Sequence, residues 1–505
     1  MGSSVGDAVV STPSDNPLVR SWRANRRSPP PARARLVAGA VVVTALGVVL
    51  SVAIGRHAAR TGAPATFVSC TYGGYVAGRC GSVAVPEDPE RPGAGKIDLH
   101  VAVLPATTRP PAGALFYLEG GPGGAATRAA VEVNQLFAAV GRRRDVVMVD
   151  QRGTGGSAPL SCPEERVPAD AAAAVTSYLR RCFARLRGDP KLDTTSVAAD
   201  DIEAVRRALG YGRIDLYGGS YGATLAQAYL RRYPGSVRSV VLDSGSLPGV
   251  RVYDVSAGNA EHALDLQLAR CGRTPSCRRA YPRSRRQLEE LLARGPRRVS
   301  LQSGTIVLRP DDIAWTVDSL SETADGAATI PYAIDAAAHG DYTALGDAYV
   351  EDLGPNLDPR SRLATFWVIL CSEPWAAFDP SATARDGAGS YLAKAAVARA
   401  RLFRRACLVV PRGRVPADSG SFEVTRAPVL LLAGGADPLD PVANLRGWRG
   451  AFPNGRLVLV PGAGHGAIAF DCVQRLVARF IAAGSADGLD TSCARHVPLP
   501  AFEVG

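Results

Sequence analysis

Short apolar runs separated by helical patterns recur along most of this chain. Runs with strand character occupy residues 66–70, 97–104, 114–118, 146–149, 214–217, 240–242, 429–433 and 457–460. Most of them are short and do not alternate between apolar and polar positions. Such runs, when helical patterns lie between them, are typical of parallel strands buried on both faces. The pattern therefore predicts an α/β domain with a mostly parallel central sheet and helices on both faces.

Residues 248–420 interrupt this rhythm. They are rich in alanine and arginine, mostly helical in pattern, and contain few strand signals. Strand runs resume after them, and an amphipathic helix is predicted at 472–483. We therefore expect one α/β core built from residues 66–247 and 421–505, with 248–420 inserted as a helical cap.

The N-terminal part of the chain has a different pattern. Residues 1–35 carry six arginines against two aspartates, and residues 36–54 then contain no charge. A 19-residue apolar stretch behind a basic flank predicts a membrane-spanning helix with its N-terminus inside. We expect a cytoplasmic tail at 1–35, a transmembrane or signal helix at 36–55 and a linker at 56–65. A cleaved signal peptide is the alternative, and a buried soluble helix is a third.

The net charge of +11, from 58 basic and 47 acidic residues, first suggests nucleic acid or an anionic membrane surface. However, lysine occurs at three positions, Lys96, Lys191 and Lys394, and the other cations are arginine. Together with the high alanine, glycine and proline content, this bias indicates GC-rich codon usage. We therefore expect no nucleic-acid partner.

The ten cysteines all follow the apolar segment, and none forms a C-x-x-C pair. An even number in this part of the chain is typical of an oxidising compartment, and the spacing does not suggest a metal site. Sequence does not define which cysteines pair. As the simplest hypothesis we join neighbours in order: 70–80, 162–182, 271–277, 371–407 and 472–493.

A candidate nucleophile follows the run at 214–217. Gly218, Ser220 and Gly222 form a G-x-S-x-G pattern, and a helical pattern begins directly after it. In a nucleophile elbow, the glycines permit a tight strand-to-helix turn that lifts the serine above the sheet. The pattern also occurs by chance around Ser4, in the polar N-terminal tail. Context favours Ser220.

A serine hydroxyl needs a base and an orienting carboxylate. His465 lies in a glycine-rich loop after the run at 457–460, and Asp437 follows the run at 429–433. These residues come in the order Ser, acid, His, each after a strand. We expect them to form the catalytic triad. Asp440 is the alternative acid.

A tetrahedral oxyanion needs preorganised N–H donors. Tyr221, which follows the nucleophile, is expected to supply one. The second is expected from the glycine-rich loop at 120–124, and since Pro122 has no N–H, it must come from Gly121, Gly123 or Gly124. No Lys-Ser/Thr follows this loop, which excludes a Walker-type phosphate site.

Five motifs together suggest a family: GGPGG (120–124), DQRGTGGS (150–157), GGSYG (218–222), D-P-x-D-P (437–441) and PGAGHG (461–466). They resemble the α/β-hydrolase peptidases of the prolyl aminopeptidase type, and within them the secreted actinobacterial tripeptidyl aminopeptidase branch. The resemblance extends from about residue 66 to 504. It implies a serine exopeptidase with an α/β-hydrolase fold and a helical cap.

The resemblance assigns Ser220, Asp437 and His465 to the triad, and Gly121 and Tyr221 to the oxyanion hole. It implies that Asp150 and Arg152 stabilise the oxyanion loop. It also implies acidic groups that pair with the substrate's free N-terminus. Glu373 in the cap is the first candidate and Glu119 the second, although Glu119 stands where the family pattern would have a neutral residue or histidine.

We therefore expect an extracytoplasmic serine aminopeptidase, membrane-anchored or secreted, that releases short peptides from substrates with a free N-terminus. The resemblance implies no metal or organic cofactor. If the N-terminal helix is not cleaved, it would also bind the membrane. A carboxylesterase or lipase using the same triad is the alternative, and a non-catalytic surface binding protein is a further one.

Overall fold

The computed structural model describes residues 67–162, 172–356, 363–421 and 423–504. The predicted tail, apolar segment and linker at 1–65 lie outside these residues. Among the helices that the structure does describe, none has both the length and the apolar character required to cross a membrane.

The core is a nine-stranded sheet with the strand order β1-β2-β3-β5-β4-β6-β7-β10-β11. The pairs from β5 to β11 are parallel, and the pairs from β1 to β5 are antiparallel. The strands are β1 Phe67–Tyr72, β2 Val76–Pro86, β3 Lys96–Leu104, β4 Ala114–Leu118, β5 Asp145–Val149, β6 Ile214–Gly219, β7 Val237–Asp243, β10 Val429–Gly434 and β11 Gly455–Val460. The prediction of a mostly parallel sheet is thus confirmed.

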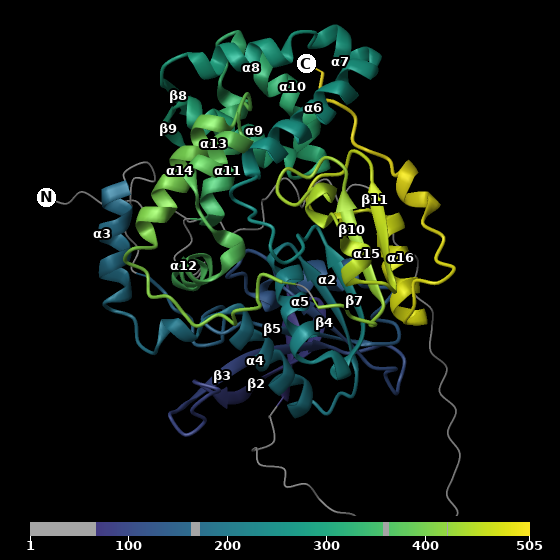
Figure 1. Ribbon diagram of the computed structural model, residues 1–505. Coiled ribbons are helices and arrows are strands. Elements are labelled where there is room, and N and C mark those ends of the chain that lie inside the picture. The colour runs from purple at the N-terminus through teal and green to yellow at the C-terminus, as the bar shows by residue number, and fades with distance from the viewer. Residues whose placement is uncertain (1–66, 163–171, 357–362, 422, 505) are drawn as a thin grey trace, which may run out of the picture. The chain divides into compact units, whose positions relative to one another are not determined.

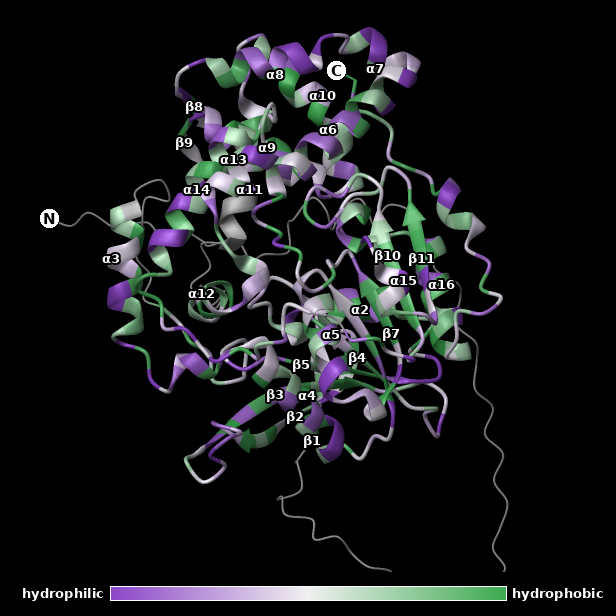
Figure 2. Ribbon diagram, in the orientation of Figure 1, coloured by the Kyte–Doolittle hydropathy of each residue, from purple (hydrophilic) through white to green (hydrophobic). Residues whose placement is uncertain are grey.

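Helices cover both faces of the sheet. On one face, α4 (Thr195–Ala208), α5 (Tyr221–Arg232) and α15 (Trp448–Ala451) pack against residues such as Phe116. On the other, α2 (Ala130–Leu136) and α16 (Asp471–Ala483) pack against residues such as Leu115. Because adjacent residues of one strand enter opposite cores, these strands have no polar face. Figure 2 shows the resulting hydrophobic strands at β10 and β11.

A second group of elements lies between β7 and β10 in the sequence. We call it the cap. It comprises α6 Ser256–Arg273, α7 Pro275–Ala280, α8 Ser284–Ala293, the hairpin β8 Arg297–Leu301 and β9 Gly304–Leu308, α9 Pro310–Ser321, α10 Ala324–Ala338, α11 Thr343–Asn356, α12 Leu363–Ser372, α13 Pro380–Asp386 and α14 Ala393–Ala406. Figure 1 shows α6 to α10 at the end of the sheet where β10 and β11 finish. The cap therefore lies over the carboxyl ends of these strands.

One helix from the core half of the sequence joins the cap. Helix α3 (Ala172–Phe183) follows β5 in the chain, yet its Tyr178 and Leu179 share an apolar cluster with Trp367 of α12 and Ala406 of α14. Figure 1 shows α3 beside α14, away from the sheet. The helical layer therefore extends beyond the predicted insertion at 248–420.

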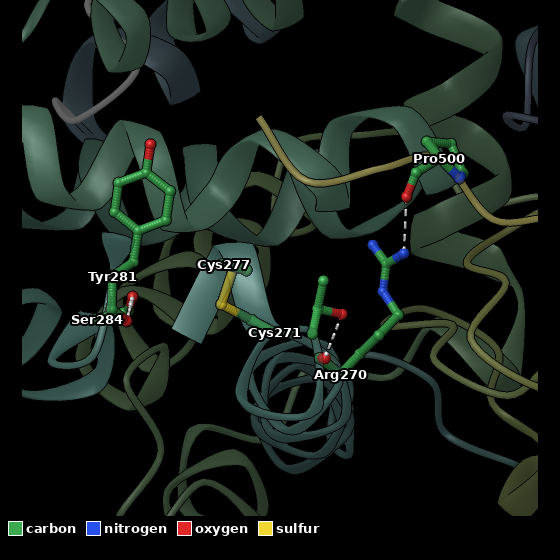
Figure 3. The surroundings of a disulfide bond; sticks show 7 residues. Arg270, Cys271, Cys277, Tyr281, Ser284 and Pro500 are labelled. Atoms are coloured by element: carbon green, nitrogen blue, oxygen red, sulfur yellow. Dashed lines mark hydrogen bonds between the residues drawn. A yellow bond between two sulfur atoms is a disulfide. The ribbon is translucent and has the colours of Figure 1, made fainter. Parts of the chain in front are cut away.

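Five disulfides join the ten cysteines: 70–80, 162–182, 271–277, 371–407 and 472–493. The pairing of neighbours in order is confirmed. Near Cys271, the Arg270 guanidinium donates to the carbonyl of Pro500 at 2.9 Å, as Figure 3 shows. The guanidinium also lies 4.0 Å from the ring centre of Phe502. The C-terminal segment, which belongs to the second part of the core in the sequence, thus returns to the cap.

Candidate active site

Ser220 occupies a strained turn between β6 and α5. Its φ and ψ are 54° and −127°, a conformation that non-glycine residues rarely adopt. A Cβ on Gly218 would lie 2.1 Å from the carbonyl oxygen of Gly222, and one on Gly222 would lie 2.1 Å from that of Leu118. Only glycine fits at both positions. The elbow predicted from the G-x-S-x-G pattern is therefore present in the backbone.

Asp437 and His465 lie on the loops after β10 and β11, and they are in direct contact. His465 Nδ1 is 3.0 and 3.1 Å from the two carboxylate oxygens of Asp437. A carboxylate only accepts, so Nδ1 carries the proton and Nε2 remains the basic nitrogen. The backbone N–H groups of Leu439 and Asp440 also donate to Asp437 Oδ1, each at 2.9 Å. Asp437 is thus held in position by the chain that follows it.

The alternative acid, Asp440, has a different partner. Its Oδ1 accepts a hydrogen bond from the hydroxyl of Ser246, which in turn accepts one from Asn444 Nδ2 at 2.9 Å. Burial, together with the charge of Asp437, raises the pKa of Asp440 to about 6, although the charge of His465 acts in the opposite direction. The geometry therefore favours Asp437 over Asp440 as the group that orients His465.

Carboxylates dominate the electrostatics of His465. Burial by itself would lower the pKa of the imidazole, but the charges of Asp437, Asp440 and Glu322 raise it to about 10. For Asp437 the effects have the opposite signs. Burial by itself would raise the pKa of its carboxyl group, but His465 and the two backbone donors hold this pKa below its ordinary value. This arrangement strongly stabilises an imidazolium that is paired with Asp437.

Among the described residues, no hydrogen bond joins Ser220 to His465, but both of their loops are hydrogen-bonded to the end of β7. The carbonyl of Asp243 accepts from the Ser220 N–H at 2.9 Å. Its carboxylate accepts from the N–H groups of Ala467 and Ile468, each at 2.9 Å, and the Ser244 hydroxyl accepts from that of Gly466 at 2.8 Å. Asp243 therefore sets the serine loop and the histidine loop relative to each other, and Ser244 adds a second contact to the histidine loop.

Neither Asp243 nor Ser244 was predicted from the sequence. A signal was available, because an acidic residue directly follows the buried run at 240–242, as Asp437 follows the strand β10. Asp243 is fully buried, and burial raises the pKa of its carboxyl group. Its hydrogen bonds from Tyr217 and from the histidine loop compensate for this burial.

The hydrogen bonds of the glycine loop at 120–124 indicate which backbone N–H groups are free to bind an oxyanion. The Gly124 N–H already donates to the carbonyl of Gly120 at 3.2 Å. Tyr221 begins α5, where the first N–H groups have no acceptor within the helix. Gly121, Ser220 and Tyr221 line one cavity. This placement favours Tyr221 and Gly121 as donors, with Gly123 as the other choice in the loop.

The cavity at Ser220 has a volume of about 610 Å³. Aromatic side chains from the cap form part of its wall, and Trp375 lies between Tyr221 and Tyr253, with ring centres 6.0 and 6.4 Å away. Charged residues of both signs also line it, among them Glu322, Glu373, Arg399 and Asp440. The wall of the site thus combines apolar and aromatic side chains with several charged groups.

Glu373 lines this cavity and is 6% exposed. Its Oε1 accepts from the Thr195 N–H at 3.0 Å, and the Thr195 hydroxyl is 2.9 Å from the Tyr221 hydroxyl. Burial raises the pKa of Glu373. Among the described residues, no cationic side chain forms an ion pair with it. The carboxylate is therefore suited to pair with a cation entering the cavity.

Glu119 is placed differently from what the second candidate role requires. It is not among the residues that line the cavity of Ser220. Its Oε1 accepts from the Gly120 N–H at 2.9 Å, and its Oε2 accepts from the Tyr117 hydroxyl at 3.2 Å. Glu119 thus orients the start of the glycine loop, and the geometry does not support it as a binding group for the substrate's N-terminus.

Asp150 and Arg152 have separate structural roles. Asp150 accepts from the N–H and hydroxyl of Thr127, just beyond the glycine loop, at 2.9 and 3.0 Å. Arg152 instead makes a buried bidentate pair with Asp201 of α4, both bonds at 2.7 Å. The expectation that both stabilise the oxyanion loop therefore fits Asp150, whereas Arg152 stabilises the contact of its own loop with α4.

Within the described ranges, no three histidine, cysteine or acidic side chains are grouped so that they could hold a metal ion.

The sequence profile of the alpha/beta hydrolase fold matches residues 113–471, which is more than half of the chain. This chain belongs to the alpha/beta hydrolase family. In this family the order of strand, elbow serine, acid and histidine is shared by many enzymes. Family membership alone consequently does not define which bond this alpha/beta hydrolase cleaves.

Curated relatives of this alpha/beta hydrolase include peptidases. Tripeptidyl aminopeptidase from Streptomyces lividans is 34% identical over 187 residues, covering 33% of this chain and 35% of that protein. Serine protease Hip1 from Mycobacterium tuberculosis is 29% identical over 224 residues, covering 39% and 42%. Proline iminopeptidase from Neisseria gonorrhoeae is 30% identical over 145 residues, covering 29% and 36%. The resemblance indicated by the motifs is confirmed, and the chain spans less than half the length of each relative.

Proposed function

We propose that this protein is an extracytoplasmic serine aminopeptidase that releases short peptides from the free N-terminus of its substrates. The observation that carries the proposal is the buried carboxylate of Glu373 in the same cavity as Ser220. A desolvated carboxylate without a cationic partner attracts a substrate ammonium group. Esterases that act on neutral substrates have no need of such a group.

The mechanism follows from the geometry of the loops. Ser220 Oγ attacks the carbonyl carbon of the scissile bond while His465 Nε2 takes its proton, and Asp437 stabilises the resulting imidazolium. The N–H groups of Tyr221 and Gly121 donate to the oxyanion. His465 then donates its proton to the leaving amine, and the acyl-enzyme forms. Water, activated by His465, attacks the acyl-enzyme, which releases the short peptide and restores Ser220.

Two features support a location outside the cytoplasm. The ten cysteines form five disulfides, a usage that is typical of oxidising compartments. The basic tail and apolar segment at 1–54 have the pattern of an export or anchoring signal. We propose that the enzyme is either anchored by this segment or secreted after its cleavage; the mass of the mature N-terminus distinguishes the two.

The test compares peptide anilides that carry free and acetylated N-termini, in wild type and in Glu373→Gln. We expect wild type to cleave the free form with at least tenfold higher kcat/KM, and Glu373→Gln to lose most of this preference. Glu289→Gln, an exposed residue on α8, is the matched control. Equal cleavage of both forms by wild type, or cleavage of esters alone, would contradict the proposal and favour a carboxylesterase.

A further inference from the structure

A second charged group in the cavity is not used by the proposed mechanism. Arg399 lies on α14 and lines the same cavity as Ser220. Its guanidinium carbon is 3.7 Å from the ring centre of Trp315 and 5.3 Å from that of Tyr253. The aromatic faces thus hold the planar group in position.

Arg399 has few partners for its hydrogen-bond donors. Nη2 donates to Ser256 Oγ at 3.3 Å. A guanidinium has five N–H donors, and among the described residues no carboxylate lies close enough to form an ion pair with this one. By contrast, the buried Arg152 forms a bidentate ion pair with Asp201. The buried Arg144 also has an acidic partner, since its Nη1 lies 3.0 Å from Asp215 Oδ2. Arg399, which is half-buried and belongs to the cap, therefore differs from the two buried arginines of the core.

Arg399 remains charged in this environment. Burial lowers its pKa, whereas the more distant charges of Asp318 and Glu322 act in the opposite direction. An arginine side chain nevertheless keeps its proton near neutral pH. A cation that is half-buried without a close anion is partly desolvated, and an anion that binds beside it compensates for this cost.

We propose that Arg399 binds a carboxylate of the peptide substrate, supplied either by an acidic side chain or by the C-terminus of a short peptide. This inference rests on the proposed aminopeptidase function. A guanidinium forms two parallel hydrogen bonds with a carboxylate, which gives both affinity and orientation. With Glu373 for the ammonium group, the cavity then offers one charged partner for each end of a dipolar substrate.

The test measures kcat/KM on matched substrate pairs with a free N-terminus. One series compares Glu with Gln at each of the first three positions of a peptide anilide, and the other compares short peptides ending in a carboxylate or in an amide. We expect wild type to favour the carboxylate member of at least one pair about tenfold. The series that shows the preference identifies the source of the carboxylate.

Three variants of α14 locate the effect. In Arg399→Gln the ratio between the two members of the preferred pair falls close to one, mainly through KM. Arg399→Lys keeps the positive charge but cannot form two parallel hydrogen bonds, so it retains part of the preference for the carboxylate substrate. Arg401→Gln removes an exposed arginine of the same helix and keeps the wild-type ratio. A wild type without preference in either series, or an unchanged ratio in Arg399→Gln, would overturn the proposal.

An ester substrate separates this inference from the peptidase proposal. Hydrolysis of p-nitrophenyl acetate needs the catalytic serine and its partners but no peptide substrate. Glutarate and its neutral diamide serve as competitive inhibitors of this reaction.

If no peptide is cleaved while the ester is hydrolysed, the aminopeptidase proposal fails. Arg399 is then still tested, because glutarate must inhibit wild type at least tenfold more strongly than Arg399→Gln. Equal inhibition of both proteins would refute the role of Arg399. Labelling of Ser220 by a neutral fluorophosphonate verifies that each variant is folded.

Discussion

His465 is a residue whose chemistry depends on how many negative charges surround it. It acts as a base only when neutral, and the carboxylates of Asp437, Asp440 and Glu322 raise its pKa to about 10. The activity should therefore rise with pH as His465 loses its proton, and the acid limb of the kcat/KM profile should lie on the alkaline side of neutral.

Removing one of the carboxylates near His465 should move the acid limb of the kcat/KM profile. In Asp440→Asn the negative charge is lost while the contact between Asp437 and His465 is kept, so the pKa of His465 falls. We expect the acid limb to move to lower pH by about one unit. Asp98→Asn, which alters an exposed residue on β3, should leave the profile in place. A limb that stays where it is in Asp440→Asn would exclude Asp440 as a source of the raised pKa.

The assignment of Ser220 as the nucleophile can be tested by comparison with Ser4, the serine of the second G-x-S-x-G pattern. Ser220→Ala should abolish labelling by a fluorophosphonate probe and reduce kcat by about 10⁶-fold. Ser4→Ala removes the serine of the other G-x-S-x-G pattern in the sequence. It should leave both measurements unchanged. Labelling that survives in Ser220→Ala would place the nucleophile elsewhere.

Residues that stand in a known motif after a strand were accessible to prediction, and residues defined by contacts across the fold were not. Ser220, Asp437 and His465 each stand just beyond an apolar run, so local pattern was sufficient to select them. The pairing of Ser244 with Gly466 joins segments 222 residues apart, which no local pattern reveals. Arg399 was missed for the same reason, since only the folded cap places it in the cavity.

Among the elements, the turn from β6 to α5 has a strict steric requirement. In Gly222→Ala the new Cβ would meet the backbone oxygen of Leu118, which cannot move without shifting β4. We expect the free energy of unfolding to fall by about 1–3 kcal/mol, together with the rate of Ser220 labelling. Denaturant unfolding measures the first quantity and probe kinetics the second.

Gly212→Ala is the matched control for this substitution. Gly212 precedes the same strand, and a Cβ there would meet nothing within 4 Å. Its effect on stability should stay within about 0.5 kcal/mol. Equal losses in the two variants would mean that the tight turn is not what makes Gly222 necessary.

The strands that were predicted and those that were missed differ in burial. The central strands are buried on both faces, and their apolar runs stand out in the sequence. Strand β2 is buried at alternate positions and contains glycine, arginine and cysteine, so its composition resembles a turn region. The hairpin of β8 and β9 is similarly half-exposed. No prediction was made for helix α3, whose partners in α12 and α14 come much later in the chain.

On the scale of the whole molecule, the C-terminal segment connects the sheet and the cap. Cys493 is tied to α16, whereas Phe502 is buried beside Cys271, Cys277 and Ala328 of the cap. The Glu503 N–H also donates to the carbonyl of Ala328 at 3.2 Å. These contacts attach the cap to the core at a point distant in sequence from the chain connections after β7 and before β10.

Loss of this attachment should loosen the cap. In Phe502→Ala we expect the free energy of unfolding to fall by about 3 kcal/mol, because a buried ring is removed from the contact with Arg270. Hydrogen exchange should accelerate in α6 and α10. The neighbouring Val504 is 47% exposed, so Val504→Ala should change neither quantity. Unaltered exchange in Phe502→Ala would show that the segment does not hold the cap.

The order of the disulfides has a consequence for biogenesis. The cysteines pair two by two in the order in which they occur along the chain, with separations of 6 to 36 residues. If the chain is threaded through a membrane from its N-terminus, as we propose, each bond can close as soon as its second cysteine emerges. No earlier cysteine then waits unpaired while later ones arrive. Oxidation can thus keep pace with translocation, and the native pairing arises without reshuffling by an isomerase.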